Sequence, residues 1–330
     1  MTALTPQQVL QFHEEGYLLV EDLFDPETVI GPVLAEYALV LERLATDLVA
    51  QGLLESTYAE LPFSDRLIRV YEESGTVHPQ YFDFSLPQNG IRDDTPMWTG
   101  PAVFAMLRHP KLLDAVESII GPEIYSNPVQ HIRIKPPENR LPKNLDAVAL
   151  ASILQTPWHQ DQGVIKEEAD DSQIVTVWFP LRDADEENGC LAVVPRSHQE
   201  GLVPHCPASA GNATGFGVHI KERVIEGRTV LPVPVKAGSA LFMTKETIHS
   251  SLRNTSDHVR ISFDLRYNPI GQPTGRPDFP GFIARSKEAP DTELRDAETW
   301  SALWQEARRA LSKGETPKFN RWDGNSPACA

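Results

Sequence analysis

The stretch Trp158-His159-Gln160-Asp161 places an imidazole and a carboxylate two residues apart. Alternate residues of an extended chain face the same way, about 7 Å apart along the strand, so both side chains can reach one metal ion. A second histidine, His249, follows a predicted strand much later in the chain. Two histidines and one carboxylate on one face of an octahedral ion leave three positions open, as in the facial triad of non-haem iron(II) oxygenases. His159, Asp161 and His249 are therefore a candidate iron site.

A His-x-Asp pattern is weak evidence by itself. The chain has 10 histidines and 46 acidic residues, so chance matches are expected. Taken alone, His159 is more simply interpreted as a polar residue whose hydrogen bonds are satisfied at the end of a strand. The choice between the two interpretations depends on the surrounding motifs.

Short strand-like segments dominate from residue 123, the region that holds these three residues. They are separated by turn formers, and many short strands at this spacing predict an antiparallel sandwich or barrel. The expected strands are Ile124–Ile134, Val175–Leu181, Leu191–Val194, Arg228–Val235, Ala240–Met243 and Val259–Tyr267. Residues 136–156 interrupt the pattern and are interpreted as an insertion near the mouth of the β structure.

The two flanks of this region are predicted to be mainly helical. The expected elements are a helix from Pro6 to Gly16, a strand at Tyr17–Val20, a helix from Asp25 to about Leu53, an ordered loop over 74–100, a helix at Leu112–Ile120 and another from about Asp296 to Leu311. Asp94 or Thr95 is expected to cap the segment after the loop. We expect one structural domain with a helical layer over 1–122, a β core over 123–270 and an extension over 271–330.

The motifs around the candidate ligands resemble those of the phytanoyl-CoA dioxygenase family of Fe(II)/2-oxoglutarate oxygenases. The stretches that carry the resemblance are Lys135-Pro136-Pro137, Trp158 to Asp161, Glu187 to His198, and Ile248-His249 through Arg260. The resemblance extends from about Pro6 to Tyr267. It implies a mainly β fold with flanking helices, namely a double-stranded β-helix, or cupin-like jelly roll.

The resemblance also implies roles for individual residues. Arg260 would pair with the distal carboxylate of 2-oxoglutarate, and Ser251 would lie beside it. Trp178 and His131 match positions that line the co-substrate pocket, although an apolar side chain is common at the position of His131. The implied iron ligands are His159, Asp161 and His249, and the implied cofactors are Fe(II), 2-oxoglutarate and O2, with ascorbate as a supporting reductant.

The residue type at position 260 suits this role. A dicarboxylate needs a planar donor that stays charged and binds in a bidentate manner, which arginine provides better than lysine. In the predicted strand, Arg260 and Arg266 share one face with other polar residues, and Ile261 and Phe263 share the other. A polar face suits either a small-molecule cavity or a solvated surface, so the alternation leaves both interpretations open.

Charge and composition exclude several classes of function. The formal net charge of −16 argues against nucleic acid and anionic membrane as partners. No run of eighteen apolar residues and no secretory signal is found, so a cytoplasmic protein with a small-molecule substrate is expected. The sequence does not predict the oligomeric state. The three cysteines, Cys190, Cys206 and Cys329, are sparse and odd in number, and no disulfide is expected among them.

The expected reaction is hydroxylation of a small organic molecule with release of succinate and carbon dioxide. Desaturation, epoxidation or rearrangement with the same cofactors is the first alternative, and a catalytically silent metal- or ligand-binding module is the second. Several other polar residues receive structural interpretations. Lys135 is expected to shape the turn at Pro136, His198 to be structural or at the mouth, and His205, His219 and His258 to be solvated.

Overall fold

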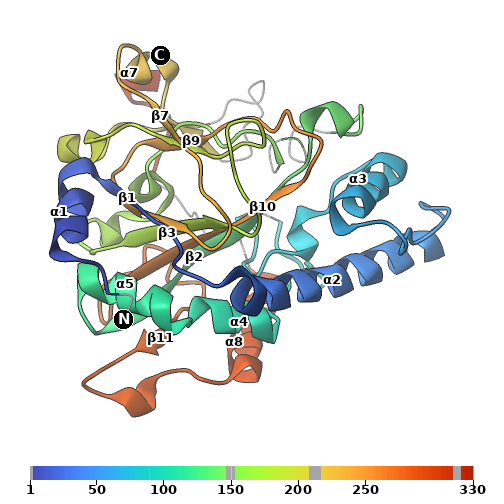
Figure 1. Cartoon of the computed structure of the whole chain (residues 1–330), viewed down its shortest axis with the longest axis horizontal. Helices are drawn as coiled ribbons and strands as arrows, with labels where there is room; N and C mark the ends of the chain where they lie inside the picture. Colours follow the sequence, from blue (N-terminus) through green and yellow to red (C-terminus); the bar gives the residue numbers. More distant parts are fainter. Residues whose placement is uncertain are drawn as a thin grey trace.

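A six-stranded antiparallel sheet forms the centre of the computed structural model (Figure 1). Its order is β1 (Tyr17–Val20), β8 (Ala240–Thr244), β3 (Val175–Pro180), β10 (Arg260–Pro269), β2 (Ile124–Lys135) and β11 (Phe282–Arg285). The structure describes residues 3–88, 90–145, 150, 153–207, 217–314 and 321–329.

A smaller antiparallel sheet faces the large sheet. It contains β7 (Leu231–Val233), β4 (Leu191–Val193) and β9 (His249–Ser251), in that order. The apolar side chains between the two sheets include Trp178 of β3 and Leu191 of β4, which belong to one buried cluster. This two-sheet antiparallel arrangement is the one that the strand spacing predicts. A separate pair is formed by β5 (Cys206–Pro207) and β6 (Val218–His219).

Helices cover the face of the large sheet that points away from the small sheet (Figure 1). They are α2 (Gly31–Ala50), α3 (Phe63–Ser74), α4 (Pro101–Leu107), α5 (Pro110–Ile120) and, from the far end of the chain, α8 (Ala297–Leu311). Between α1 (Pro6–Glu15) and β1, Gly16 takes the left-handed conformation that ends the helix, with φ of 82°. The short α7 (Glu222–Ile225) lies apart from this layer (Figure 1).

Strand β10 separates the hydrophobic core from the polar interior. Its residues Ile261, Phe263 and Leu265 are buried in the cluster that includes the helical layer. The alternating residues Arg260 and Asp264 line a cavity between the sheets instead. The polar face of this strand is therefore buried, and the interpretation as a solvated surface is wrong.

The pairing of β10 with β2 contains an irregularity next to the site. Asp264 lies opposite His131, but Arg266 lies opposite Asn127, so β2 contributes extra residues at this point. Pro128 lies in the extra stretch and has no N–H to offer the ladder. The backbone carbonyl of Val129 is left to accept a hydrogen bond from the Arg266 guanidinium at 2.6 Å.

Several predicted boundaries need correction. Gly100, not Asp94 or Thr95, precedes α4, and the hydroxyl of Thr95 accepts a hydrogen bond from the Arg92 N–H at 2.7 Å in a turn. Strand β7 is shorter than predicted, and β11 and α3 were not predicted as separate elements. In the predicted insertion, residues 146–149 and 151–152 lie outside the described residues. None of the described helices is long and apolar enough to cross a bilayer.

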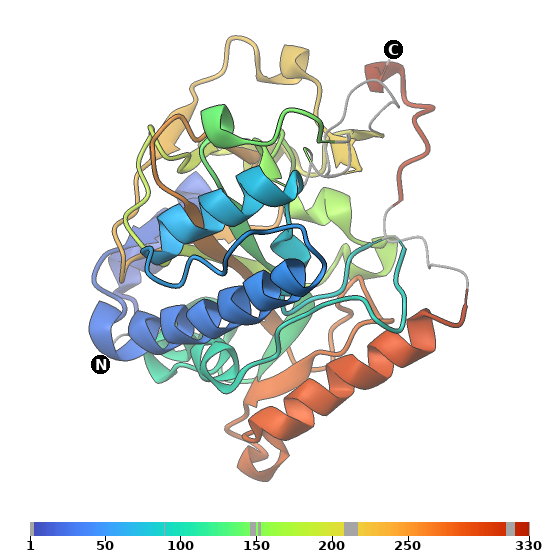
Figure 2. The same cartoon turned by 90° about the vertical axis from the view of Figure 1, so that its right-hand side faces the viewer.

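The expectation that no cysteines pair is wrong. Cys206 and Cys329 form a disulfide across 123 residues of sequence, with their Cα atoms 5.3 Å apart, and Cys190 is free and buried. Sequence spacing could not show this pair because the fold, not a local motif, brings the two cysteines together. The chain end leaves α8 and returns to the opposite part of the molecule, as Figure 2 shows.

Candidate metal and co-substrate site

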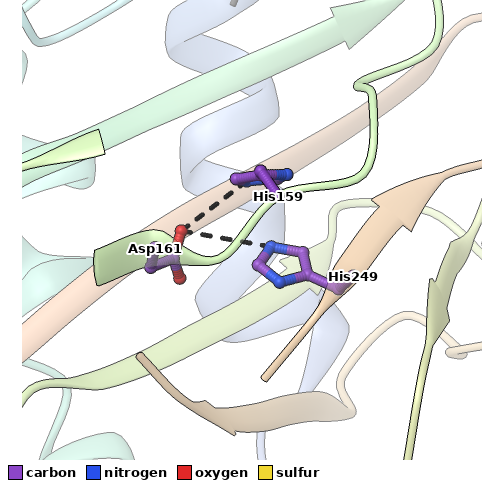
Figure 3. A group of neighbouring side chains, drawn as sticks. All are labelled: His159, Asp161 and His249. Carbon is purple, nitrogen blue, oxygen red and sulfur yellow. Dashed lines mark ion pairs between the residues drawn. The ribbon is translucent and has the colours of Figure 1, made fainter. Parts of the chain in front are cut away.

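The side chains of His159, Asp161 and His249 point toward one another (Figure 3). One ligand atom from each lies within 4.8 Å of the others. The Asp161 Oδ1 atom is 3.7 Å from Nε2 of His159 and 4.0 Å from Nε2 of His249. All three residues are buried, with at most 4% of their surface exposed. A set of two imidazoles and one carboxylate with this spacing fits one divalent iron ion.

Backbone pairing holds the two histidines side by side. His159 and His249 exchange both backbone hydrogen bonds, each at 3.0 Å, so the segment before Asp161 extends the small sheet next to β9. Asp161 then begins a short 3-10 turn, Asp161–Val164. The predicted extended geometry therefore holds for His159 but ends at Asp161.

The other ring nitrogen of each histidine is held by a backbone carbonyl. Nδ1 of His159 lies 2.9 Å from the Pro157 oxygen, and Nδ1 of His249 lies 2.9 Å from the Thr247 oxygen. A carbonyl accepts a hydrogen bond from Nδ1–H, which leaves Nε2 as the ligand atom. Burial, together with the nearby His249 ring, lowers the pKa of His159 well below its usual value. The imidazole is therefore neutral, as metal binding requires.

A second layer of polar groups positions the Asp161 carboxylate. The guanidinium of Arg266 forms a buried ion pair with Oδ1, and the hydroxyl of Thr176 donates to Oδ2. Burial alone would raise the pKa of Asp161, but Arg266 and the two imidazoles offset this effect and lower the pKa. The carboxylate is therefore ionised. Arg266 thus forms a structural ion pair, and its partner is the candidate ligand itself.

Gln160 points away from its two neighbours and fixes the segment in place. Its side-chain nitrogen donates to the oxygens of Gly201 and Glu246 at 2.8 and 2.7 Å, and its side-chain oxygen accepts from the Val203 N–H at 2.8 Å. Its backbone N–H donates to Nε2 of His205 at 2.9 Å. Four hydrogen bonds from one residue immobilise the backbone between the two candidate ligands.

Arg260 lies on the wall of the cavity between the two sheets. It is 3% exposed, and in the part of the chain that the structure describes no carboxylate pairs with it. One guanidinium nitrogen donates to the Ser262 hydroxyl, and the charge lies 5.6 Å from the Trp178 ring centre. Burial lowers the pKa of Arg260 to about 10, so the group stays charged at neutral pH. A buried cation without an anion fits the binding of a carboxylate.

A second cation lies close to Arg260. The ammonium of Lys135 donates to the Ser251 hydroxyl at 2.7 Å and to the Leu252 carbonyl at 2.6 Å. Burial, and then the charge of Arg260, lowers the pKa of Lys135 well below its usual value. Lys135 therefore has contacts beyond the turn at Pro136 that it is expected to shape. The strand pairing, which puts Lys135 opposite Arg260, was the missing information.

Most of the predicted site residues line the cavity between the two sheets. Its lining residues come from both sheets and from the segment before Asp161. They are Arg133, Thr156, His159, Trp178, Leu191, Met243, His249, Ser251, Arg260 and Asp264. Trp178 and Ser251 thus lie where the co-substrate residues are expected, and Arg133 and Asp264 add charged groups that sequence analysis did not single out.

His131 has a different environment from the other predicted residues. Its Nδ1 lies 2.9 Å from the Asp83 carboxylate, and it is not among the lining residues of the cavity. Burial lowers the pKa of His131 even though Asp83 opposes this effect. Asp83 comes from the predicted loop over 74–100, which sequence analysis could not place next to β2. A role for His131 in co-substrate binding stays a prediction.

The remaining histidines divide into structural and solvated groups. His205 is fully buried, so the expectation that it is solvated is wrong. His219 is half-buried and His258 is exposed. Nε2 of His198 lies 2.9 Å from the His13 carbonyl, which confirms a structural role for His198.

Comparison with known proteins identifies the family. A family model described as phytanoyl-CoA dioxygenase (PhyH) matches residues 12–262. The chain belongs to the PhyH family. The phytanoyl-CoA dioxygenase domain-containing protein 1 of Danio rerio is 26% identical over 272 residues, which cover 79% of this chain and 88% of the relative. The ectoine dioxygenase of Bordetella parapertussis is 25% identical over 296 residues, which cover 84% and 79%.

Solved structures support the fold. The non-haem monooxygenase ThoJ in complex with nickel has a TM-score of 0.53 at 15% identity, over 92% of this chain and 99% of ThoJ. The predicted jelly roll with flanking helices is confirmed, although the two sheets of this PhyH protein do not close into a barrel. The protein is a non-haem iron dioxygenase that uses Fe(II), 2-oxoglutarate and O2.

Proposed function

We propose that this PhyH protein hydroxylates a small organic molecule, with conversion of 2-oxoglutarate to succinate and carbon dioxide, and that His159, Asp161 and His249 hold its iron. The observation that carries the proposal is the convergence of these three ligand atoms within 4.8 Å, with His159 and His249 lining the same cavity as Arg260. The cavity thus combines a metal-binding group with a cationic anchor.

Each residue has a separate task in this proposal. The two imidazoles and the Asp161 carboxylate hold the metal, and Arg266 and Thr176 keep the carboxylate ionised and oriented. Arg260 and Ser251 bind the distal carboxylate of 2-oxoglutarate, which supplies the missing anion to the buried guanidinium, and Lys135 donates a hydrogen bond to the Ser251 hydroxyl. The bound iron supplies the activation of O2. Trp178 forms part of the wall that keeps water from the cavity.

We prefer hydroxylation to halogenation because the Asp161 carboxylate is present. It takes the coordination position that a halide would need for halogenation. Desaturation, epoxidation and rearrangement would use the same protein groups, since these outcomes depend on which substrate hydrogen faces the metal. Mass analysis of the product separates desaturation, which removes two hydrogens, from hydroxylation, which adds one oxygen atom. Epoxidation of an alkene also adds one oxygen atom, so NMR of the product separates it from hydroxylation.

A small substrate is supported by the relatives and by the cavity. One relative is named for ectoine and others for phytanoyl-CoA. In the cavity, Arg133 and Asp264 provide opposite charges next to the apolar wall formed by Leu191 and Met243. A polar small molecule can interact with both kinds of group.

Anaerobic addition of Fe(II) and 2-oxoglutarate tests the proposal directly. We expect a weak visible charge-transfer band, and succinate release once air is admitted, with ascorbate present to keep the iron reduced. The band should disappear in the variant His249→Ala and persist in His258→Ala, whose histidine is exposed and outside the cavity. A parent protein that binds iron but gives neither a band nor succinate would support the silent-module alternative.

A further inference from the structure

The end of the chain packs against the segment that carries Asp161. The indole N–H of Trp322 donates to the Gly163 carbonyl at 2.7 Å. Arg321 forms an ion pair with Asp170 at 2.7 Å and donates to the Ile165 carbonyl at 3.3 Å. These contacts satisfy backbone carbonyls in and just after the 3-10 turn Asp161–Val164. We call residues 321–329 the tail (Figure 2).

The tail also acts on the segment that carries Asp161 through a contact with His205. The Trp322 ring stacks on the His205 ring, with centres 5.2 Å apart and planes 23° apart. His205 in turn accepts the backbone N–H of Gln160, between the two candidate ligands, at 2.9 Å. A side chain at position 163 would collide with the His205 ring, so Gly163 permits this close approach. Trp322 and His205 therefore hold the segment 160–163 from two sides.

A disulfide ties the tail to this arrangement. Cys206 follows His205 directly and is 2% exposed, whereas its partner Cys329 is half-buried near the end of the chain. Arg223 provides a further contact through a hydrogen bond to the Ala328 carbonyl at 2.6 Å. A reductant can approach the bond from the side of Cys329. Besides these polar contacts, the Trp322 indole packs against the apolar cluster that includes Val164 and Ile165.

We propose that the tail is a redox-released brace on the metal-ligand segment. With the Cys206–Cys329 disulfide intact, Trp322 and His205 hold Asp161 in position for the metal. When the disulfide is reduced, the tail leaves and the segment 160–165 opens more often, so the metal is bound more weakly. The metal part of this inference rests on the proposed role of Asp161 as a ligand.

The redox step is an ordinary thiol–disulfide exchange. A thiolate of a dithiol attacks the Cys329 sulfur, the S–S bond breaks, and Cys206 leaves as a thiolate that takes up a proton. The second thiol of the reductant then displaces Cys329 and closes the reductant's own disulfide. Two electrons and two protons pass to the protein, and a disulfide oxidant such as oxidised glutathione reverses the reaction.

The bond itself is tested by peptide mapping without reduction. The full-length protein is incubated with oxidised glutathione and digested, and we expect a linked peptide pair that contains Cys206 and Cys329, with Cys190 alkylated only after unfolding. Two free thiols at these positions after oxidation would overturn the proposal.

Hydrogen exchange of segment 160–165 measures the brace without any metal. We expect exchange to rise by roughly tenfold or more in the reduced protein and in Cys329→Ser, since the hydrogen bonds to this segment weaken. Cys190→Ser is the matched control and should behave like the parent. Trp322→Ala leaves the disulfide intact and should raise the exchange as well. Equal exchange in the oxidised, reduced and Trp322→Ala proteins would overturn the proposal.

Mn(II) affinity then connects the brace to the metal. We expect the reduced protein, freed of reductant under anaerobic conditions, to bind Mn(II) roughly tenfold more weakly than the oxidised protein. Equal affinity in the two forms would overturn the metal part of the inference. If Mn(II) binds His249→Ala as well as it binds the parent, the proposed metal role fails, while the exchange experiment still decides whether the brace exists.

Discussion

Two buried arginines at opposite ends of β10 show how the same residue type serves two purposes. Arg266 is 2% exposed and pairs with the Asp161 carboxylate. Arg260 is 3% exposed, and no carboxylate among the described residues pairs with it. Both point into the interior from the same face of the strand, about 20 Å apart along an extended chain. The protein itself neutralises the guanidinium of Arg266, and Arg260 is the proposed anchor of 2-oxoglutarate.

The difference follows from the cost of burying charge. An ion pair inside a protein compensates the lost hydration of both groups only if the partner is present. At the Arg266 end the chain provides that partner: burial would lower the pKa of Arg266, but Asp161 and Asp264 together outweigh burial and raise it. At the Arg260 end burial dominates and the pKa falls to about 10. A buried cation that no carboxylate of the described chain neutralises is thus the expected feature of the proposed co-substrate site.

The largest effect is expected from Asp161→Asn. The variant should lose metal binding and turnover, and it should also leave the buried Arg266 with only the more distant Asp264 carboxylate, at 3.4 Å, as its anion. We expect the free energy of unfolding to fall by about 3–5 kcal/mol, measured by urea denaturation of the metal-free protein. His249→Ala is the matched control, because it should abolish turnover while it leaves the ion pair intact. Equal stability of Asp161→Asn and the parent would contradict the role of the pair.

Arg260→Ala should weaken co-substrate binding without loss of stability, which is the opposite of the pattern expected for Asp161→Asn. We expect the KM for 2-oxoglutarate to rise by roughly 10- to 100-fold, since a hydrogen bond to a charged group contributes about 1.5–3 kcal/mol. The free energy of unfolding should stay the same or rise, because an uncompensated buried charge is removed. Steady-state kinetics with varied 2-oxoglutarate checks the first expectation. Arg260→Lys should recover part of the affinity, and an unchanged KM in Arg260→Ala would remove this residue from the site.

Arg266→Met sharpens the comparison at the other end. The variant leaves the Asp161 carboxylate without its counter-ion, so the metal-free protein should lose about 2–3 kcal/mol of stability. Added Mn(II) should restore part of this loss, since the metal replaces the missing positive charge. The KM for 2-oxoglutarate should stay near the parent value. A large rise in that KM would show that Arg266, not Arg260, binds the co-substrate.

The sequence was sufficient to predict the parts of this site that depend on strand periodicity and motif spacing. The spacing of His159 and Asp161 and the family motif around His249 identified three residues that the fold brings together. The alternation in β10 placed Arg260 and Arg266 on one face. Both results depend on local geometry, which a short stretch of sequence largely determines.

The contacts that the sequence could not predict all join distant segments. Lys135 reaches Ser251 across 116 residues, and Asp83 reaches His131 across 48. The Cys206–Cys329 pair spans 123 residues. Each depends on which strands and loops become neighbours, so no local pattern of residues could show it. His205 is buried for the same reason, since the returning tail covers it.

The smallest effects are expected from two hydroxyl groups, Thr176 of β3 next to Arg266 and Ser262 of β10 next to Arg260. Thr176 donates to Asp161, and the Ser262 hydroxyl accepts from Arg260. Thr176→Val should lower stability by about 1 kcal/mol and weaken Mn(II) binding a few-fold, with the KM for 2-oxoglutarate unchanged. Ser262→Ala should change that KM a few-fold and leave Mn(II) binding unchanged, because it touches only the anchor. Mn(II) affinity and the KM for 2-oxoglutarate are measured for both variants. If each hydroxyl affects metal and co-substrate binding alike, the surroundings of the two arginines are one coupled network and the contrast between the arginines fails.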